Sequence, residues 1–353
     1  MKIEDMRKEI DKIDLKIQDL LGRRGLTVLE IAKIKKMSGK RCYAPDREKL
    51  IFDRILKKNK GPMPNEGLKA IYREIVSACR NLEMPISVAY MGPEASFSHQ
   101  AAMEKFGSST ELIPAADIAE VFMLTEKGEV DLGIVPVENS SEGVVTYTVD
   151  MFVDSPLKII NEMMIEVVHY LVSGEKDISR VKTIYSHPQV FGQTKNWLRH
   201  NFPDAKLIQV ESTAEAARIV SNKNACAAIT SRWAAKVYGL NVLRAHLEDM
   251  AHNYTRFLVV AKDGVGRTGR DKTSLIFSVK DNPGTLYHYL SVFARAKINL
   301  SKIESRPSKK KAWDYLFFID LEGHIEDLKI KKALAKLEDS CVYMKVLGSY
   351  PRQ

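Results

Sequence analysis

The segment NYTRFLVV, residues 253 to 260, places a hydroxyl and a guanidinium directly before an apolar run. Thr255 can donate a hydrogen bond to an oxygen atom, and Arg256 can hold a carboxylate through paired N–H donors. Such a pair at the mouth of a buried strand suits a site for a small anion. The alternative is an ordinary turn in which the hydroxyl bonds to nearby backbone. The rest of the chain must decide between the two.

A second group of candidates lies in the N-terminal segment. Arg24 and Lys35 are eleven residues apart, about three turns of an α-helix, so they share one face. Arg7 precedes Arg24 by seventeen residues, roughly 25 Å along a helix axis. One helix cannot bring all three cations to one small anion, whereas two antiparallel copies can, with Arg7 arriving from the partner chain. The alternative is that each cation is solvated on the helix surface.

Polar clusters also follow several predicted strands. Ligands of open α/β sheets gather at the carboxyl ends of strands and at helix N-termini, so several such clusters together predict a cleft for a small polar anion. Each cluster alone would pass as turn chemistry. Ser98 is expected to cap the next helix, and Ser212 with Glu215 forms a capping box. The clusters are GPEASFSHQAA (92–102), PVENSSEG (136–143), SHPQVFGQ (186–193) and EST (211–213).

The elements that position these residues begin with a helical segment. Apolar residues at helical spacing from Met6 to Leu21 predict an amphipathic helix that continues to about residue 36. Further helices are predicted over 46–58 and 66–83. The first helix is roughly 50 Å long and needs a partner to cover its apolar stripe. Residues 1–84 are therefore expected to form an all-α domain.

The remainder of the chain alternates strands and helices. Residues 86–262 have the pattern of an α/β domain, and residues 263–272 form a charged, Gly-rich linker. Residues 273–353 follow the order β-α-β-β-α-β of a small ferredoxin-like sandwich. Its first helix is expected to begin with Asn282 as the cap and Pro283 at the first helical position. The predicted strands cover about 273–279, 298–304, 313–321 and 340–348.

Bulk properties exclude several classes of protein. At 353 residues the chain is expected to hold two or three domains. No apolar run approaches the ~20 residues of a membrane span, and the charged N-terminus is unlike a signal peptide. Four scattered cysteines and eight histidines without ligand spacing indicate neither disulfides nor a metal. The net charge of +9 favours a basic surface and anionic ligands, because no nucleic-acid module or nucleotide loop is present. A reduced cytoplasmic protein without a cofactor is expected, and the SKKKAW run from Ser308 is expected to be a solvated hairpin loop.

The motifs MRKEIDKID, LLGRRGLTVLEIAKIK, YAPDREKLI and IYREIVSACRNLE resemble the all-helical chorismate mutases over the whole N-terminal segment. The resemblance implies an intertwined dimer that holds a dicarboxylate in a cationic pocket. The rearrangement is pericyclic, so catalysis comes from holding the reactive conformer and stabilising charge on the breaking C–O bond. The resemblance assigns the substrate carboxylates to Arg7 (from the partner chain), Arg24 and Arg47, the ether oxygen to Lys35 and Glu83, and the substrate hydroxyl to Glu48.

Two positions depart from related sequences. Ala44 stands where an Asp is frequent, which removes one polar contact. Glu83 stands where some members carry Gln, and only a protonated Glu can donate to an ether oxygen. The resemblance therefore predicts a pKa of Glu83 raised by burial, mutase activity that declines as pH rises through it, and a flattened profile in Glu83→Gln. The alternative is a surface Glu at a helix end.

The four polar clusters and NYTRF resemble the prephenate dehydratase domain over about 86–262. The resemblance implies a two-lobed α/β fold like that of periplasmic binding proteins, with the site in the cleft between the lobes. Prephenate must lose a ring hydroxyl and a ring carboxylate, so a positioned hydroxyl that donates to the leaving oxygen would assist the reaction. In this resemblance Thr255 is the key catalytic residue, Arg256 is a carboxylate or structural anchor, and the cleft is lined by Asn139, Ser186, Gln193, Ser212 and Thr213.

The C-terminal motifs DNPGTLYHYL, IESRP, WDYLFFIDLEGH and MKVLGSYP resemble an ACT domain of the phenylalanine-sensing kind. A helix N-terminus beside Gly284 can take the carboxylate of an amino acid, and a polar bend at Glu304–Ser305 is expected to help hold it. Thr285 replaces a more usual Ala. The alternative is a dimerisation domain without a ligand. The expected phenylalanine site comprises Asn282, Gly284, Thr285, Leu286, Glu304, Ser305, Arg306 and Pro307.

Taken together, the three resemblances in this order identify the chain as a member of the bifunctional chorismate mutase–prephenate dehydratases (P-proteins). This implies an isomerase and a lyase in phenylalanine biosynthesis, with phenylalanine as allosteric inhibitor and a homodimer or tetramer as the assembly. Neither nucleic acid nor a membrane is an expected partner. The alternatives are a silent amino-acid-binding regulator, a nucleic-acid-binding protein and an arogenate dehydratase.

Overall fold

The computed structural model describes residues 3–37, 43–250, 252–279, 282–307 and 315–352. The chain divides into two compact units. One unit comprises residues 1–87 with 103–111, and the other comprises residues 88–102 with 112–353. Each unit is described separately below.

The first unit is built from three helices. The long α1 and the shorter α2 both pack against α3. Pro45 begins α2 at a position where its missing N–H is not needed. The predicted helices are confirmed, with bounds that differ by at most a few residues from those expected. They are α1 (Ile3–Met37), α2 (Pro45–Lys58) and α3 (Asn65–Glu83).

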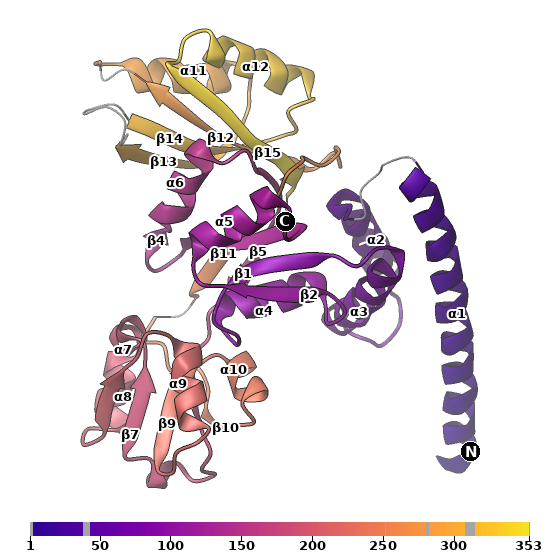
Figure 1. Ribbon diagram of the computed structural model, residues 1–353, viewed down its shortest axis with the longest axis vertical. Coiled ribbons are helices and arrows are strands. Elements are labelled where there is room, and N and C mark those ends of the chain that lie inside the picture. The colour runs from indigo at the N-terminus through magenta and orange to yellow at the C-terminus, as the bar shows by residue number, and fades with distance from the viewer. Residues whose placement is uncertain (1–2, 38–42, 251, 280–281, 308–314, 353) are drawn as a thin grey trace. The chain divides into compact units, whose positions relative to one another are not determined.

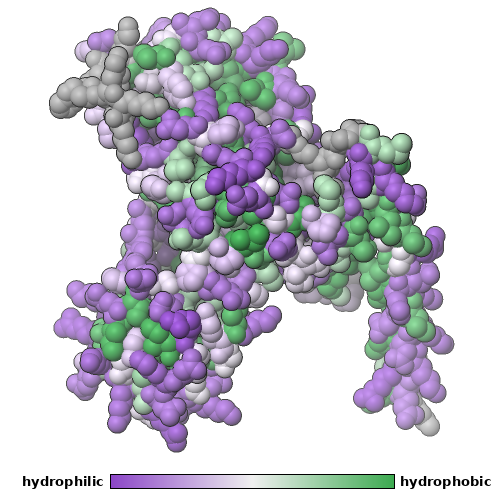
Figure 2. All heavy atoms as spheres, in the orientation of Figure 1, coloured by the Kyte–Doolittle hydropathy of each residue, from purple (hydrophilic) through white to green (hydrophobic). Residues whose placement is uncertain are grey.

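The apolar stripe of α1 is not covered within this unit. Ile10 is 56% exposed and Leu20 is 58% exposed, and Gly25 is the buried residue of this helix. Figure 2 shows apolar side chains at the surface along α1. A helix of a globular protein normally buries such a stripe. The exposed stripe of α1 is therefore suited to contact with a second apolar surface.

In the second unit, a six-stranded sheet forms what we call the first lobe. Its strands run in the order β2-β1-β3-β11-β5, with β4 beside β3. β1 and β3 are parallel, whereas β11 is antiparallel to both of its neighbours, β3 and β5. The lobe contains β1 (Ser87–Met91), α4 (Phe97–Phe106), β2 (Glu111–Ala115), α5 (Ile118–Lys127), β3 (Leu132–Asn139), β4 (Gly143–Val144), α6 (Thr146–Asp154), β5 (Lys158–Glu166) and β11 (Tyr254–Ala261).

A five-stranded sheet forms the second lobe, in the order β10-β6-β9-β7-β8. The chain enters this lobe between β5 and β6 and returns between β10 and β11, so two segments connect the lobes. This arrangement confirms the two-lobed α/β architecture. The lobe contains β6 (Tyr170–Ser173), a 3-10 turn (Ile178–Arg180), β7 (Thr183–Ser186), α7 (Pro188–Gln193), α8 (Lys195–Asn201), β8 (Lys206–Gln209), α9 (Thr213–Val220), β9 (Cys226–Thr230), α10 (Arg232–Val237) and β10 (Asn241–Arg244).

The C-terminal sandwich has four antiparallel strands in the order β13-β14-β12-β15. Helices α11 and α12 cover one face (Figure 1), where Phe277 and Phe293 share a core. The other face packs on the first lobe, and Phe318 and Tyr350 join the core of that lobe. The elements are β12 (Asp271–Val279), α11 (Thr285–Arg295), β13 (Leu300–Pro307), β14 (Tyr315–Glu322), α12 (Leu328–Glu338) and β15 (Tyr343–Pro351).

Some local expectations were wrong. Ser96, not Ser98, caps α4, because its Oγ accepts the N–H of His99 at 3.2 Å. Helix α11 begins at Thr285 after Gly284, whose φ of 84° is in the left-handed region that glycine adopts readily. Asn282 instead closes the preceding turn, where its carbonyl accepts the N–H of Thr285 at 3.1 Å. The other expected cap is confirmed, since Ser212 Oγ accepts the N–H of Glu215 at 3.0 Å.

Among the described residues, no helix is long and apolar enough to cross a membrane. Cys79, Cys226 and Cys341 are free thiols. The expected hairpin loop from Ser308 lies outside the described residues.

Candidate functional site

Strands β3 and β11 bring Asn139 and Thr255 together as directly opposite residues; we call them the site pair. Asn139 Nδ2 donates to Thr255 Oγ1 at 2.8 Å and to Asn253 Oδ1 at 2.8 Å. The N–H groups of Ser141 and Glu142 donate to Asn139 Oδ1 at 2.9 and 3.0 Å, which fixes the orientation of the amide. Thr255 Oγ1 is therefore an acceptor toward Asn139. Its proton has no acceptor among the described residues, so it can be donated to a ligand.

The second lobe supplies the other expected residues. Its strands β7 and β8 are parallel, so their carboxyl ends lie at one edge of the sheet. Ser186 ends β7 there, but it is fully buried and its hydroxyl donates to the carbonyl of Ile229 at 2.8 Å. Ser212 caps α9, and Thr213 is the first residue of that helix. Ser186 therefore supports the sheet, whereas Ser212 and Thr213 stand at a helix N-terminus.

Gln193, the last residue of α7, connects the two lobes. Its Nε2 donates to Glu142 Oε1 at 3.0 Å, and Glu142 belongs to the loop that follows Asn139 in the first lobe. Its Oε1 lies 2.7 Å from Nε2 of His169. His169 was not predicted from the sequence, because a single histidine in an apolar segment gives no signal.

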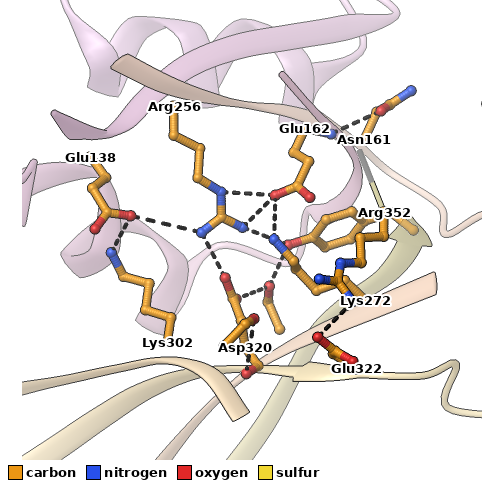
Figure 3. Close-up of polar contacts among 12 residues, drawn as sticks. Glu138, Asn161, Glu162, Arg256, Lys272, Lys302, Asp320, Glu322 and Arg352 are labelled. Atoms are coloured by element: carbon orange, nitrogen blue, oxygen red, sulfur yellow. Dashed lines mark hydrogen bonds and ion pairs between the residues drawn. The ribbon is translucent and has the colours of Figure 1, made fainter. Parts of the chain in front are cut away.

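Arg256 follows Thr255 in the chain but engages a different set of residues (Figure 3). The buried guanidinium donates to Asp320 Oδ2 at 2.6 Å, to Glu162 Oε2 at 2.8 Å and to the Tyr350 hydroxyl at 3.0 Å. Burial opposes the charge of Arg256, but Tyr350, Asp320 and Glu162 raise its pKa above the ordinary value. Of the two roles expected for Arg256, these contacts favour the structural one.

The surroundings of Arg256 form a charge-balanced cluster between the first lobe and the C-terminal sandwich. Lys272 Nζ lies 2.8 Å from Glu162, and Lys302 Nζ lies 2.6 Å from Glu138. The cluster thus holds three cations and three carboxylates, shown in Figure 3. They are Arg256, Lys272 and Lys302 with Glu138, Glu162 and Asp320.

Glu138 and Arg256 face each other across β3 and β11, one step along the ladder from Asn139 and Thr255; we call Glu138 and Arg256 the anchor pair. Successive residues of a strand point to opposite faces. The anchor pair therefore points to the face opposite the site pair. There, Glu138 pairs with Lys302 and Arg256 pairs with Asp320, and both partners belong to the C-terminal sandwich.

In the helical unit, two of the expected residues are in direct contact. Lys35 Nζ lies 2.5 Å from Glu83 Oε1, and both side chains are largely shielded from solvent. Arg24 is half-buried, and its Nη1 atom is buried without a hydrogen-bond partner among the described residues. Arg7 and Arg47 are exposed. One copy of the unit thus holds donors that are ready for an anion.

Glu48 has a partner that was not predicted. Arg80 Nη1 donates to Glu48 Oε1 at 2.6 Å, and Arg80 Nη2 donates to Thr110 Oγ1 at 3.2 Å and to the carbonyl of Phe106. Burial raises the pKa of Glu48 above its ordinary value, although Arg80 opposes this. Arg80 was missed because it lies 32 residues from Glu48, where helical spacing gives no information.

The expected phenylalanine residues lie on two elements. Gly284, Thr285 and Leu286 stand at the start of α11. Glu304 and Ser305 lie inside the continuous strand β13, so the expected polar bend is wrong. Lys302, Glu304 and Arg306 alternate along β13 with more exposed residues, and Arg306 Nη2 lies 3.0 Å from Asp150 of α6. The described residues hold no cluster of ligands suited to a metal ion.

Comparisons with known proteins agree with this three-part organisation. Family models match for chorismate mutase type II over residues 6–84, prephenate dehydratase over 88–265 and the ACT domain over 273–339. The bifunctional chorismate mutase/prephenate dehydratase of Aquifex aeolicus is 48% identical over 99% of this chain and 98% of its own length.

The corresponding protein of Stutzerimonas stutzeri is 41% identical over the same shares of the two chains. A crystal structure of prephenate dehydratase from Arthrobacter aurescens in complex with L-Phe is 34% identical, with a TM-score of 0.69, and covers 76% of this chain and 90% of that one. This chain therefore belongs to the family of bifunctional chorismate mutase/prephenate dehydratases.

Proposed function

We propose that this isomerase and lyase dehydrates prephenate at the site pair, within a domain of residues 86–262. The observation that carries the proposal is the hydrogen bond from Asn139 to Thr255, which leaves the hydroxyl proton of Thr255 available. A donor of this kind assists the ring hydroxyl as it departs as hydroxide. The ring carboxylate leaves as carbon dioxide, and the electron pair of the broken C–C bond completes the aromatic ring of phenylpyruvate.

Neutral groups are expected to line the remainder of this site. Gln193 presents its amide between the lobes, and Ser212 and Thr213 present a helix N-terminus that favours an anion. Arg256 is not available as a direct substrate ligand in this arrangement, because its donors are taken up by Glu162, Asp320 and Tyr350. We assign it to the structural support of Thr255.

The rearrangement of chorismate is assigned to residues 1–84 of two intertwined copies. Two observations support the dimer: the apolar stripe of α1 is exposed, and Arg7 lies at the far end of that helix from Lys35. Arg24 and Arg47 then hold the substrate carboxylates with Arg7 of the partner. Lys35 and Glu83 meet the ether oxygen, and their mutual contact opens when substrate enters.

We assign residues 273–353 to feedback inhibition by phenylalanine. The start of α11 beside Gly284 offers backbone N–H groups to a carboxylate. β13 runs in the same direction as β12 and therefore finishes at the end of the sheet from which α11 starts, with Ser305 and Pro307 exposed. Inhibition requires that phenylalanine bind more tightly to a conformation of the enzyme in which the site pair cannot convert prephenate. β13 is an edge strand, which also suits side-by-side pairing in a dimer or tetramer. A cytoplasmic location is expected for this enzyme.

One assay tests these assignments together. Purified protein is given chorismate, and prephenate and phenylpyruvate are followed with and without phenylalanine. Production of phenylpyruvate that phenylalanine suppresses supports all three domains. Accumulation of prephenate by the wild type would remove the assignment of the site pair, and conversion of arogenate in its place would identify the related dehydratase. Tight phenylalanine binding without turnover would identify a silent regulator.

A further inference from the structure

His169 occupies one of the two segments that connect the lobes. Its backbone is held on both sides: its carbonyl accepts the N–H of Leu247 at 3.2 Å, and its N–H donates to Glu248 Oε2 at 3.0 Å. The side chain is 1% exposed, and the ring meets Phe97 edge-on. The imidazole therefore has a fixed place in the second unit, between the lobes and away from solvent.

The polar partners of Gln193 fix the tautomer of this imidazole. Glu142 is a carboxylate that only accepts hydrogen bonds, so the Gln193 atom beside it at 3.0 Å is the NH₂ group. The carbonyl oxygen of Gln193 then faces His169, and Nε2 of His169 donates to it at 2.7 Å. Nδ1 of His169 carries the lone pair and has no partner among the described residues.

A neutral ring fits this arrangement. Burial lowers the pKa of His169, although Gln193 and Glu248 act in the opposite direction. A neutral imidazole with its proton on Nε2 is a donor toward Gln193 only. It thereby excludes the flipped amide, which would turn an NH₂ group toward an N–H donor.

Resting on the proposed dehydratase site, we propose that His169 is a positioning residue that holds the NH₂ group of Gln193 toward an anionic oxygen of the substrate. Glu142 fills the place of that oxygen when the site is free of substrate. The same loop supplies the N–H groups that orient Asn139. An entering carboxylate thus competes with the carboxylate of Glu142 for Gln193, and displacing Glu142 frees its side chain without disturbing its backbone contact to Asn139.

Two predictions of opposite sign follow from this competition. Loss of the Gln193 donor removes a hydrogen bond to a charged group, so Gln193→Ala raises KM for prephenate about tenfold or more. Loss of the competing carboxylate in Glu142→Ala lowers KM by roughly twofold or more, because a larger fraction of the free enzyme is competent to bind. A purely structural contact predicts no improvement in either variant.

The decisive experiment is a double-mutant cycle with steady-state kinetics on prephenate. His169→Leu, Gln193→Ala and the double variant are compared with His169→Gln, which retains an N–H donor near the position of Nε2. We expect His169→Leu to raise KM nearly as much as Gln193→Ala does, the double variant to be no worse than Gln193→Ala, and His169→Gln to recover most of the loss. Mutase turnover of the same preparations calibrates the concentration of folded protein.

Each other outcome contradicts a defined claim. Additive losses in the double variant, or a His169→Gln variant as impaired as His169→Leu, would mean that His169 only packs between the lobes. A Gln193→Ala variant with the kinetics of the wild type would overturn the inference and leave the site pair standing. Full activity in Thr255→Ala would instead overturn the proposed function on which the inference rests.

Discussion

The cations of the helical unit and those of the two-lobed domain differ in whether carboxylates neutralise them. In the helical unit, Arg7 and Arg47 are exposed and Arg24 has a buried nitrogen without a partner among the described residues. Beside the site pair, by contrast, Arg256 and Lys302 are already neutralised by carboxylates. The helical unit thus has cationic donors that can bind an anion, whereas the site pair has hydroxyl and amide donors.

This difference matches the two reactions. A pericyclic rearrangement with charge developing on an ether oxygen is accelerated by fixed cations. A reaction that expels a carboxylate as carbon dioxide gains from leaving that carboxylate weakly solvated, so a nearby free cation would oppose it. In the proposed site, the cations near the site pair are paired with carboxylates of the cluster and are therefore not available to the substrate.

The largest expected effect is at Thr255. Thr255→Ala should lower kcat for prephenate by ~10²- to 10⁴-fold, the range for loss of a positioned proton donor. Thr255→Ser keeps the hydroxyl and should retain much of the activity. The measurement is the initial rate of phenylpyruvate formation. Equal activity in the Ala and Ser variants would exclude the hydroxyl from the reaction.

Removing a cation from the helical unit should affect the other reaction. Arg24→Ala should lower mutase kcat/KM by ~10²- to 10³-fold, as for loss of a transition-state donor, while Arg23→Ala on the exposed face of the same helix should not. If the sites are shared between chains, mixing Arg7→Ala with Arg24→Ala subunits should restore turnover, because a mixed dimer contains one intact site. Failure of correctly exchanged subunits to regain activity would contradict the shared site.

The anchor pair should act on stability. Arg256→Met leaves Asp320 buried without its cation and leaves Glu162 with Lys272 alone, so it should lower the free energy of unfolding of the second unit by ~3–5 kcal/mol. Arg352→Met removes the more exposed ion pair with Glu322, at 2.6 Å, and should cost under about 1 kcal/mol. Urea unfolding followed by tryptophan fluorescence compares the two. Similar losses of stability in the two variants would show that the buried cluster contributes no more than a partly exposed ion pair.

The smallest expected effect is in the pH profile of the mutase. Because burial raises the pKa of Glu48, this carboxyl becomes protonated at a higher pH than an ordinary glutamate. A protonated Glu48 no longer offers a carboxylate to the substrate hydroxyl, so kcat/KM should fall as pH drops through the raised pKa. Glu48→Gln does not titrate and should lack this acid limb. An unchanged limb in that variant would assign it to another group.

Local pattern was enough for much of the fold. Helical spacing placed α1, α2 and α3, and the alternation of strands and helices gave the two-lobed domain and the C-terminal sandwich. The errors arose where two nearby residues could both serve as a cap: Ser96 directly precedes α4 and Ser98 is its second residue, and only the chain geometry selects Ser96 as the cap. At α11, the left-handed Gly284 displaced the expected start at Pro283.

The site was predicted only in part, for a physical reason. Asn139 and Thr255 could be proposed as residues at strand ends, but their contact depends on strand pairing across 116 positions of the chain. The partners of Arg256 lie 64 and 94 positions away, on strands whose order in the sheets no local pattern specifies. The bond between His169 and Gln193 likewise depends on how α7 packs against the segment between β5 and β6. Tertiary pairing of this kind is decided by packing rather than by propensity.

The most direct test of the contrast between the two regions is a product analysis over time. Wild type, Arg24→Ala and Thr255→Ala are each given chorismate, and then prephenate in a separate reaction. We predict that Thr255→Ala converts chorismate and stops at prephenate, and that Arg24→Ala leaves chorismate unchanged but converts prephenate to phenylpyruvate at the wild-type rate. A single substitution that abolished both conversions in a folded protein would contradict two separate sites with different chemistry.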